Sequence, residues 1–108
     1  MVSRIFNIEA IRQAVKENRI VWRKHVLERM MQRGIKRAQI CEAIVNGECI
    51  REYFDDKPFP SGLFLAYFDN EPLHVVAGID EIALEAFIIT AYTPTLDVFN
   101  DDFKTRRT

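Results

Sequence analysis

The stretch Trp22-Arg-Lys-His-Val-Leu-Glu-Arg-Met-Met-Gln-Arg-Gly-Ile35 decides the fold of this 108-residue chain. At the 3.6-residue period of an α-helix its apolar side chains fall on one arc, which predicts an amphipathic helix with one side in a core. The residues of that arc are Trp22, Val26, Leu27, Met30 and Met31. Gly34 is expected to end the helix, because a left-handed residue after the last turn costs glycine little.

A polar stripe on the same helix points to a site. His25, Arg29 and Arg33 lie four residues apart, so they line up along the helix and border its apolar arc. Charged side chains of an ordinary surface helix lie away from that border, so the stripe predicts one wall of a polar cleft. Two structural explanations stay open. His25 could donate to a backbone carbonyl at a core edge, and the two arginines could pair with carboxylates such as Glu52, Asp55 or Asp56.

Helical periodicity continues on both sides of this stretch. Asn7 is a good N-cap, and apolar residues recur at helical spacing from Ile8 to about Asn18. Residues 19–21 are expected to form a short connector. After the central helix a third helix is predicted to end at Asn46-Gly47, and its start is weakly specified because Lys36 is not a capping residue.

From Glu48 onward the apolar pattern becomes that of strands. Four strands are predicted, at residues 49–54, 63–68, 73–79 and 84–92. The short links favour an antiparallel meander. We therefore predict one α+β domain, residues 1–108, whose N-terminal helices pack on one face of a four-stranded antiparallel sheet. Its parts are a helical half at 1–47, the sheet at 48–92, and a C-terminal segment with a basic tail at 93–108.

Alternation along the strands groups the polar side chains that the sheet could offer to a cleft. His74 is expected to share a face with Val76 and Gly78, and Tyr92 to share one with Thr90 and Ile88. Which face meets the helices depends on strand register, and the sequence leaves the register open. His74 and Tyr92 also have structural interpretations, the first as a residue at a sheet edge and the second as a core residue with one satisfied hydroxyl.

Composition and charge restrict the class of protein. The chain is 48% hydrophobic and 29% charged, as globular domains are, and it has neither an apolar run of about 20 residues nor a signal-peptide core, so we expect a cytoplasmic protein without membrane spans. Cys41 and Cys49 are expected to be reduced thiols rather than zinc ligands. Residues 1–47 hold ten basic and four acidic residues, whereas residues 48–103 hold two and twelve. The basic half could attract a polyanion, or it could lie against the acidic sheet or a second copy of the chain.

Several segments together resemble one family. They are His25-Val-Leu-Glu-Arg29-Met-Met-Gln-Arg33-Gly-Ile35, Leu73-His74-Val75-Val76 and Asp101-Asp102-Phe103-Lys104-Thr105-Arg106-Arg107. Over residues 20–107 the chain is similar to the small bacterial domain of unknown function 4258, with mild departures at Val26 and Lys36. The resemblance implies a distant relationship to compact bacterial toxins of the RelE and barnase type, a group that includes metal-independent ribonucleases. It also implies a small zinc-finger, antitoxin-like protein as a partner.

The residue types suit RNA cleavage without a metal or another cofactor. Histidine transfers protons near neutral pH, and the planar fork of arginine holds two phosphate oxygens at once. We assign His25 as acid or base, Arg29 and Arg33 as a phosphate clamp, and His74 or Tyr92 as the second proton carrier. The predicted function is a toxin-like, metal-independent endoribonuclease, with RNA and an antitoxin-like protein as partners. The alternative is a non-catalytic module that binds a protein partner or forms a homodimer.

Overall fold

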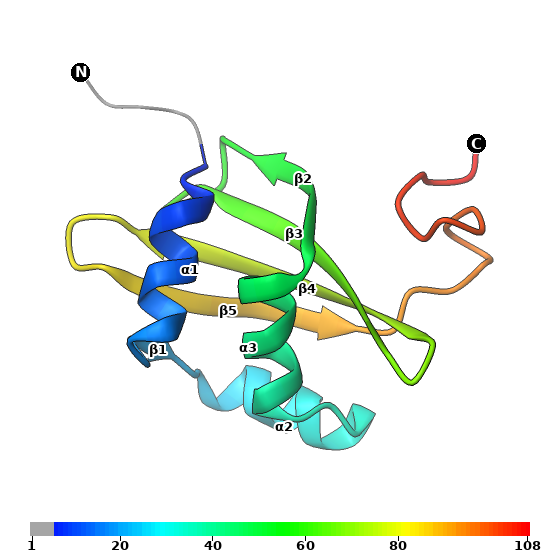
Figure 1. Cartoon of the computed structure of the whole chain (residues 1–108), viewed down its shortest axis with the longest axis horizontal. Helices are drawn as coiled ribbons and strands as arrows, with labels where there is room; N and C mark the ends of the chain where they lie inside the picture. Colours follow the sequence, from blue (N-terminus) through cyan, green and yellow to red (C-terminus); the bar gives the residue numbers. More distant parts are fainter. Residues whose placement is uncertain (1–5) are drawn as a thin grey trace.

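Five strands form one mixed sheet in the computed structural model, which describes residues 6–108, and their order across the sheet is β1-β5-β4-β3-β2. Figure 1 shows the elements, whose bounds are α1 Ile8–Lys16, β1 Ile20–Val21, α2 Lys24–Arg33, α3 Arg37–Asn46, β2 Glu48–Tyr53, β3 Ser61–Phe68, β4 Glu71–Asp80 and β5 Glu85–Tyr92. The predicted α+β class is confirmed. Within residues 6–108 no helix combines the length and the apolar character needed to cross a bilayer.

The predicted four-stranded, purely antiparallel sheet is wrong by one strand. Strands β2 to β5 do form an antiparallel meander, but Ile20 and Val21, which were expected to be a connector, pair in parallel with Ala86 and Phe87. A strand of two residues is too short to show a period in the sequence. It becomes a strand because it forms hydrogen bonds with the edge of β5. The pairing is extended by Arg19, whose carbonyl accepts from Ala86 N (2.9 Å) and whose guanidinium donates to the carbonyls of Ala83 and Leu84.

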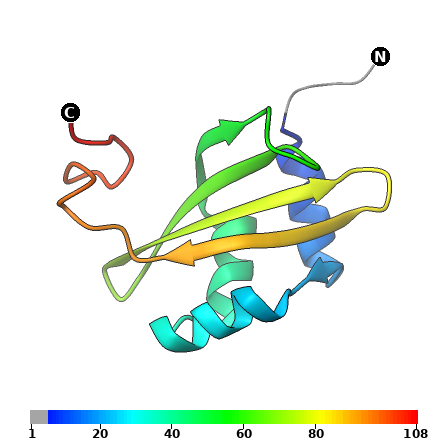
Figure 2. The same cartoon turned by 180° about the vertical axis from the view of Figure 1, so that it is seen from behind.

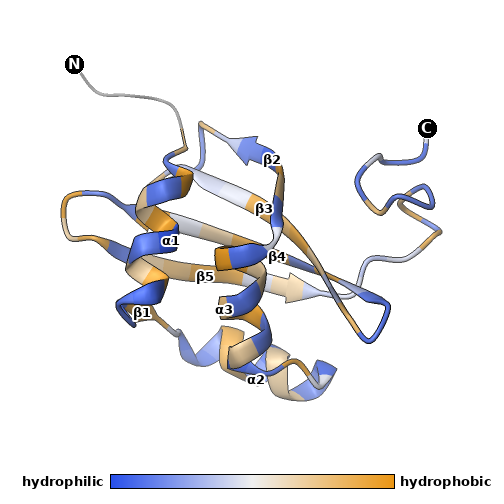
Figure 3. Cartoon of the chain, viewed as in Figure 1, coloured by the Kyte–Doolittle hydropathy of each residue, from blue (hydrophilic) through white to orange (hydrophobic). Residues whose placement is uncertain are grey.

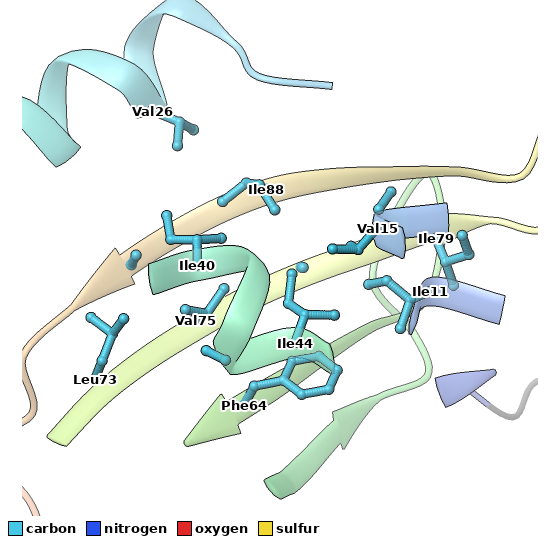
Figure 4. Close-up of a cluster of buried hydrophobic side chains, with 14 of the residues drawn as sticks. Ile11, Val15, Val26, Ile40, Ile44, Phe64, Leu73, Val75, Ile79 and Ile88 are labelled. Atoms are coloured by element: carbon cyan, nitrogen blue, oxygen red, sulfur yellow. The ribbon is translucent and has the colours of Figure 1, made fainter. Parts of the chain in front are cut away.

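Helices α1 and α3 lie across one face of the sheet, and the main core fills the space between them and the strands (Figure 1 and Figure 4). Alternate residues of β4 supply one wall, as the period-2 pattern of a strand with one buried face requires. The core side chains include Ile11, Val15, Ile40, Ile44, Phe64, Leu73, Val75, Ala77, Ile79 and Ile88. In Figure 3 both helices carry hydrophobic and hydrophilic residues, and the buried ones are Ile11, Ala14 and Val15 of α1 and Ile40, Ala43 and Ile44 of α3.

A bulge in β5 changes which side chains share a face. Val76 pairs with Thr90, but the next residue, Ala77, pairs with Ile88, so Ile89 is the extra residue. Ile88 therefore faces the helices, while Thr90 faces the opposite side together with its partner Val76. Thr90 and Tyr92 share a face as expected, but the expectation that Ile88 shares it is wrong, because strict alternation does not allow for an inserted residue.

Helix α2 runs beside the sheet, along β5, and not across a face (Figure 1 and Figure 2). Gly34 ends it in the left-handed conformation with φ 68°, as predicted. Only a narrow stripe of the helix meets the body: Val26 and Met30 are buried there, and Leu27 is partly buried beside them. Met31, expected in the core, is 83% exposed, because a helix at the edge of a sheet is covered on one side only.

The face of the sheet opposite α1 and α3 is crossed by no helix in Figure 2. Two irregular segments cover its ends. At one end the ring of Phe59, from the loop between β2 and β3, packs 5.4 Å from the ring of Phe87. At the other end the chain after Tyr92 folds back so that the carbonyl of Phe103 reaches His74. We call this side the open face.

Candidate functional site

The structure brings together His25, Arg29 and Arg33 as one wall of a cavity of about 270 Å³. All three side chains are exposed. Residues 89–91 of β5 form the opposite wall, and the buried pair Val26 and Met30 forms the floor. We call this cavity the α2 groove. The sequence could indicate it because residues four apart on one helix must point the same way.

The groove exists because β1 covers only the first part of the β5 edge. The pairing ends at Phe87, so beyond that residue α2 is the neighbour of β5. Arg33 ties the helix to the strand there, since its Nη1 donates to the carbonyl oxygen of Ala91 over 2.7 Å. This bond satisfies a backbone acceptor at the strand edge and holds the guanidinium at one end of the groove.

The α2 groove is positive. None of the eight residues that line it is acidic. The ion pairs within residues 6–108 join Lys104 to Glu48 and Arg107 to Asp101, so neither arginine of the stripe forms the structural pair considered above. Asp56, one of the carboxylates considered, instead accepts a hydrogen bond from Ser61. The stripe therefore keeps its charge available to a ligand.

A second cavity, of about 410 Å³, adjoins the α2 groove and shares His25, Val26 and Ile89 with it. It adds Arg23 and Lys57 to the lining, together with one carboxylate, Asp56. The guanidinium of Arg23 lies over the ring of Phe87, 6.0 Å from its centroid. His25 thus lies between two hollows, which together make a predominantly basic path along the α2 edge of the sheet.

His74 and Tyr92 are brought together, but not in the α2 groove. They are cross-strand partners on the open face, and His74 is fully buried between the sheet and the C-terminal segment. Its Nε2 lies 2.7 Å from the carbonyl oxygen of Phe103, and its Nδ1 lies 3.2 Å from the hydroxyl of Tyr92. A carbonyl can only accept, so Nε2 carries the hydrogen, and in the neutral ring Nδ1 accepts the Tyr92 proton.

This placement separates the five predicted site residues into two groups. Neither His74 nor Tyr92 lines the α2 groove, so the structure does not bring them to His25 as the second proton carrier. The reason is the register: His74 alternates with Leu73 and Val75, which face the helices, and therefore points to the other side. His74 is also not at a sheet edge, because β4 is flanked by β3 and β5.

Sequence reasoning missed three side chains that meet Tyr92. Arg51 and Tyr53 from β2 and Arg106 from the C-terminal segment line a cavity of about 330 Å³ with it. Arg51 and Tyr53 lie two residues apart on β2, so strand alternation puts them on one face, and this is a signal that the sequence carries. Arg106 gave none, because a basic residue near a chain end is usually a solvated one. We call this cavity the C-terminal pocket.

Acidification is expected to destabilise the docking of the C-terminal segment on His74. Burial lowers the pKa of His74 from its ordinary value of 6.5. The hydrogen bond to Phe103 raises this pKa, and the charge of Arg51 lowers it, but burial has the largest effect. Between pH 6.5 and the lowered pKa the unfolded chain therefore binds a proton that the folded protein does not. The contribution of neutral His74 to the free energy of unfolding should be complete above pH 6.5. It should decrease as the pH falls from 6.5 toward the lowered pKa.

Urea unfolding on both sides of pH 6.5 measures this effect. His74→Gln is the control, because it removes the titrating group and should flatten that part of the pH dependence. An equal slope in His74→Gln and the unmodified protein would mean that other groups cause the loss.

Comparison with known proteins identifies one family. A family model described as "Domain of unknown function (DUF4258)" matches residues 22–93, which begin two residues before α2, end one residue after β5 and include four of the five strands. No curated protein matches the chain, and no solved structure does.

Proposed function

The chain belongs to the DUF4258 family, and we propose that it is a toxin-like, metal-independent endoribonuclease that cleaves RNA in the α2 groove. One observation carries this proposal. An exposed imidazole and two guanidinium groups line a single cavity that has no acidic side chain in its lining. Such a cavity attracts a polyanion and supplies a group that can move a proton.

The two arginines suit the phosphate of the scissile bond. Arg33 uses Nη1 on Ala91, and a guanidinium has five N–H donors, so it keeps others for a phosphate oxygen. Arg29 has no hydrogen-bond or ion-pair partner among the described residues. Together they can neutralise the negative charge that grows on the phosphate oxygens, and this interaction is worth more in a partly enclosed groove than in open water.

His25 can carry both proton transfers in succession. As a neutral base it takes the proton of the ribose 2′-hydroxyl, whose oxygen then attacks phosphorus while the bond from phosphorus to the 5′-oxygen breaks. The imidazolium formed in this way returns the proton to the leaving 5′-oxygen. The products are a 2′,3′-cyclic phosphate and a 5′-hydroxyl end, and the enzyme finishes in its starting protonation state.

Arg29→Ala tests the proposal directly. We expect the unmodified protein to cleave RNA in the presence of EDTA and the variant to be slower by about 10²–10³, the usual effect of losing one donor aimed at a developing charge. Lys24→Ala is the matched control. It removes one positive charge from an exposed position of the same helix, outside the lining of the groove, and should leave the rate nearly unchanged.

Intact RNA with folded protein at every enzyme concentration would refute the nuclease and favour the alternative, a non-catalytic interaction module. An equal loss in Arg29→Ala and Lys24→Ala would mean that net charge alone matters. As part of the proposal, the substrate is RNA of the cytoplasm, and a small antitoxin-like protein inhibits the enzyme by covering the positive groove.

A further inference from the structure

The C-terminal pocket lies on the open face and is independent of the α2 groove. Its walls come from β2, β3, β5 and the C-terminal segment, and no residue of its lining is shared with the groove. Figure 1 and Figure 2 show the C-terminal segment, in orange to red, at the end of the sheet where β5 finishes. A pocket of about 330 Å³ is of the size that holds a small ligand.

Backbone bonds within the C-terminal segment hold Arg106 at this pocket. Phe99 and Arg106 form an antiparallel bridge, and Asn100 N donates to the carbonyl of Thr105 over 2.8 Å. The buried ring of Phe99 packs at 4.8 Å on the ring of His74, which anchors this small hairpin to the sheet. Arg106 is therefore a placed residue and not part of a free tail.

The pocket has cations and no acids. Arg51 and Arg106 are both in its lining, and none of its lining residues is Asp or Glu. Neither guanidinium has a hydrogen-bond or ion-pair partner among the described residues. Both line the same pocket as Tyr92, and their charges lower the pKa of its hydroxyl against the larger raising effect of burial. Two unpaired arginines beside one hydroxyl are suited to an anion.

The bond to His74 determines what Tyr92 can offer to a ligand. Nε2 of His74 donates to Phe103, so Nδ1 accepts and the Tyr92 hydroxyl must donate to it. The Tyr92 oxygen then keeps only acceptor capacity on its pocket side. A ligand that satisfies it has to bring a donor, and a ribose hydroxyl is such a donor, whereas a phosphate dianion is not.

We propose that the C-terminal pocket binds a ribonucleotide, with its phosphate on Arg51 and Arg106, its 2′-hydroxyl donating to Tyr92, and its base against the aromatic rings of the lining. The rings available are those of Tyr53 and Tyr92, because the ring of Phe99 is buried against His74. Bases stack on aromatic side chains with little sequence preference, and the 2′-hydroxyl is the group that distinguishes RNA from DNA. The pocket thus recognises ribose, while the α2 groove holds the proposed chemistry.

Nuclear magnetic resonance of the ¹⁵N-labelled full chain tests this site without cleavage. The probes are adenosine 3′-monophosphate, its 2′-deoxy counterpart and a short oligoribonucleotide. We expect the ribonucleotide to shift the amide signals of Arg51, Tyr53, Tyr92 and Arg106. If the mononucleotide shifts them, a free nucleotide is sufficient. If only the oligonucleotide does, the natural ligand is a nucleotide within an RNA strand.

Three variants separate the contributions of the contacts. Arg51→Gln and Arg106→Gln should each weaken ribonucleotide binding about tenfold or more, the effect of a charge-assisted hydrogen bond. Tyr92→Phe should abolish a preference of about fivefold for ribose over deoxyribose. Arg37→Gln, which removes an exposed arginine that lies over the ring of Trp22, is the control and should bind normally.

Two results would overturn the proposal. One is that none of the three probes, at millimolar concentration, shifts the amide signals of the residues that line the C-terminal pocket. The other is unchanged affinity in Arg51→Gln and Arg106→Gln. Both arginines are exposed, so these variants should fold. The readout is binding and not RNA cleavage, so failure of the nuclease proposal would leave this test interpretable.

Discussion

Replacing His25 by alanine is expected to lower the rate of RNA cleavage by about 10²–10⁴, the contribution of a positioned acid or base. His25 is the imidazole of the α2 groove, and the other titratable side chains in the lining are arginines, which stay protonated. No neighbour in the groove can replace it in proton transfer. Single-turnover cleavage with excess enzyme measures the effect on the chemical step.

Free imidazole should partly restore cleavage by His25→Ala, because the vacated position opens to solvent. The control is Gln32→Ala, an exposed change on the same helix outside the lining of the groove. A rate unchanged in His25→Ala, or a loss that imidazole does not relieve at all, would contradict proton transfer by this side chain. Thermal unfolding of both variants checks that the fold is retained.

Phe64→Ala is expected to lower the free energy of unfolding by about 3–5 kcal/mol, the range for removing a buried aromatic ring. Phe64 has no exposed surface, lies in the helix-covered face of β3, and meets the ring of Phe6 edge to face at 6.0 Å. Alanine would leave a cavity between α3 and the sheet in the region that Figure 4 shows. The total free energy of unfolding of a native domain is about 5–15 kcal/mol, so this loss would be a large part of it.

Urea unfolding measures the change, and Tyr67→Ala is the matched control. Tyr67 lies on the same strand but is 53% exposed, and we expect its loss to cost about 1 kcal/mol or less. Equal destabilisation by the two substitutions would mean that the face of β3 has been assigned wrongly.

The α+β class was predictable because most of it depends on local patterns. The end of α2 at Gly34 and the cap of α1, where the Asn7 side chain accepts from Ala10 N, need only neighbouring residues. The meander of β2 to β5 follows from strands joined by short links. Strand β1 was not predictable, because two residues are too few to show a period. They adopt strand conformation only by pairing with the edge of β5.

The candidate site was predictable to the same extent. His25, Arg29 and Arg33 lie four residues apart on one helix, so their common direction is a local property and the groove contains all three. His74 and Tyr92 were assigned to the wrong cavity, because the side that a strand residue faces depends on register. The bulge at Ile89 adds a second change of face that alternation cannot reveal.

By itself, the sequence determined where the helices and strands β2 to β5 form, which residues share a helix face, and that the fold is of the α+β class. These properties depend on interactions among residues close along the chain. Tertiary structure alone decided that α2 lies at the edge of the sheet, that β1 joins β5, and that the C-terminal segment brings Arg106 to Arg51 and Tyr92. These features depend on contacts between residues tens of positions apart. Such contacts stabilise the fold only after the intervening chain has formed a closed loop, so they leave no local pattern in the sequence.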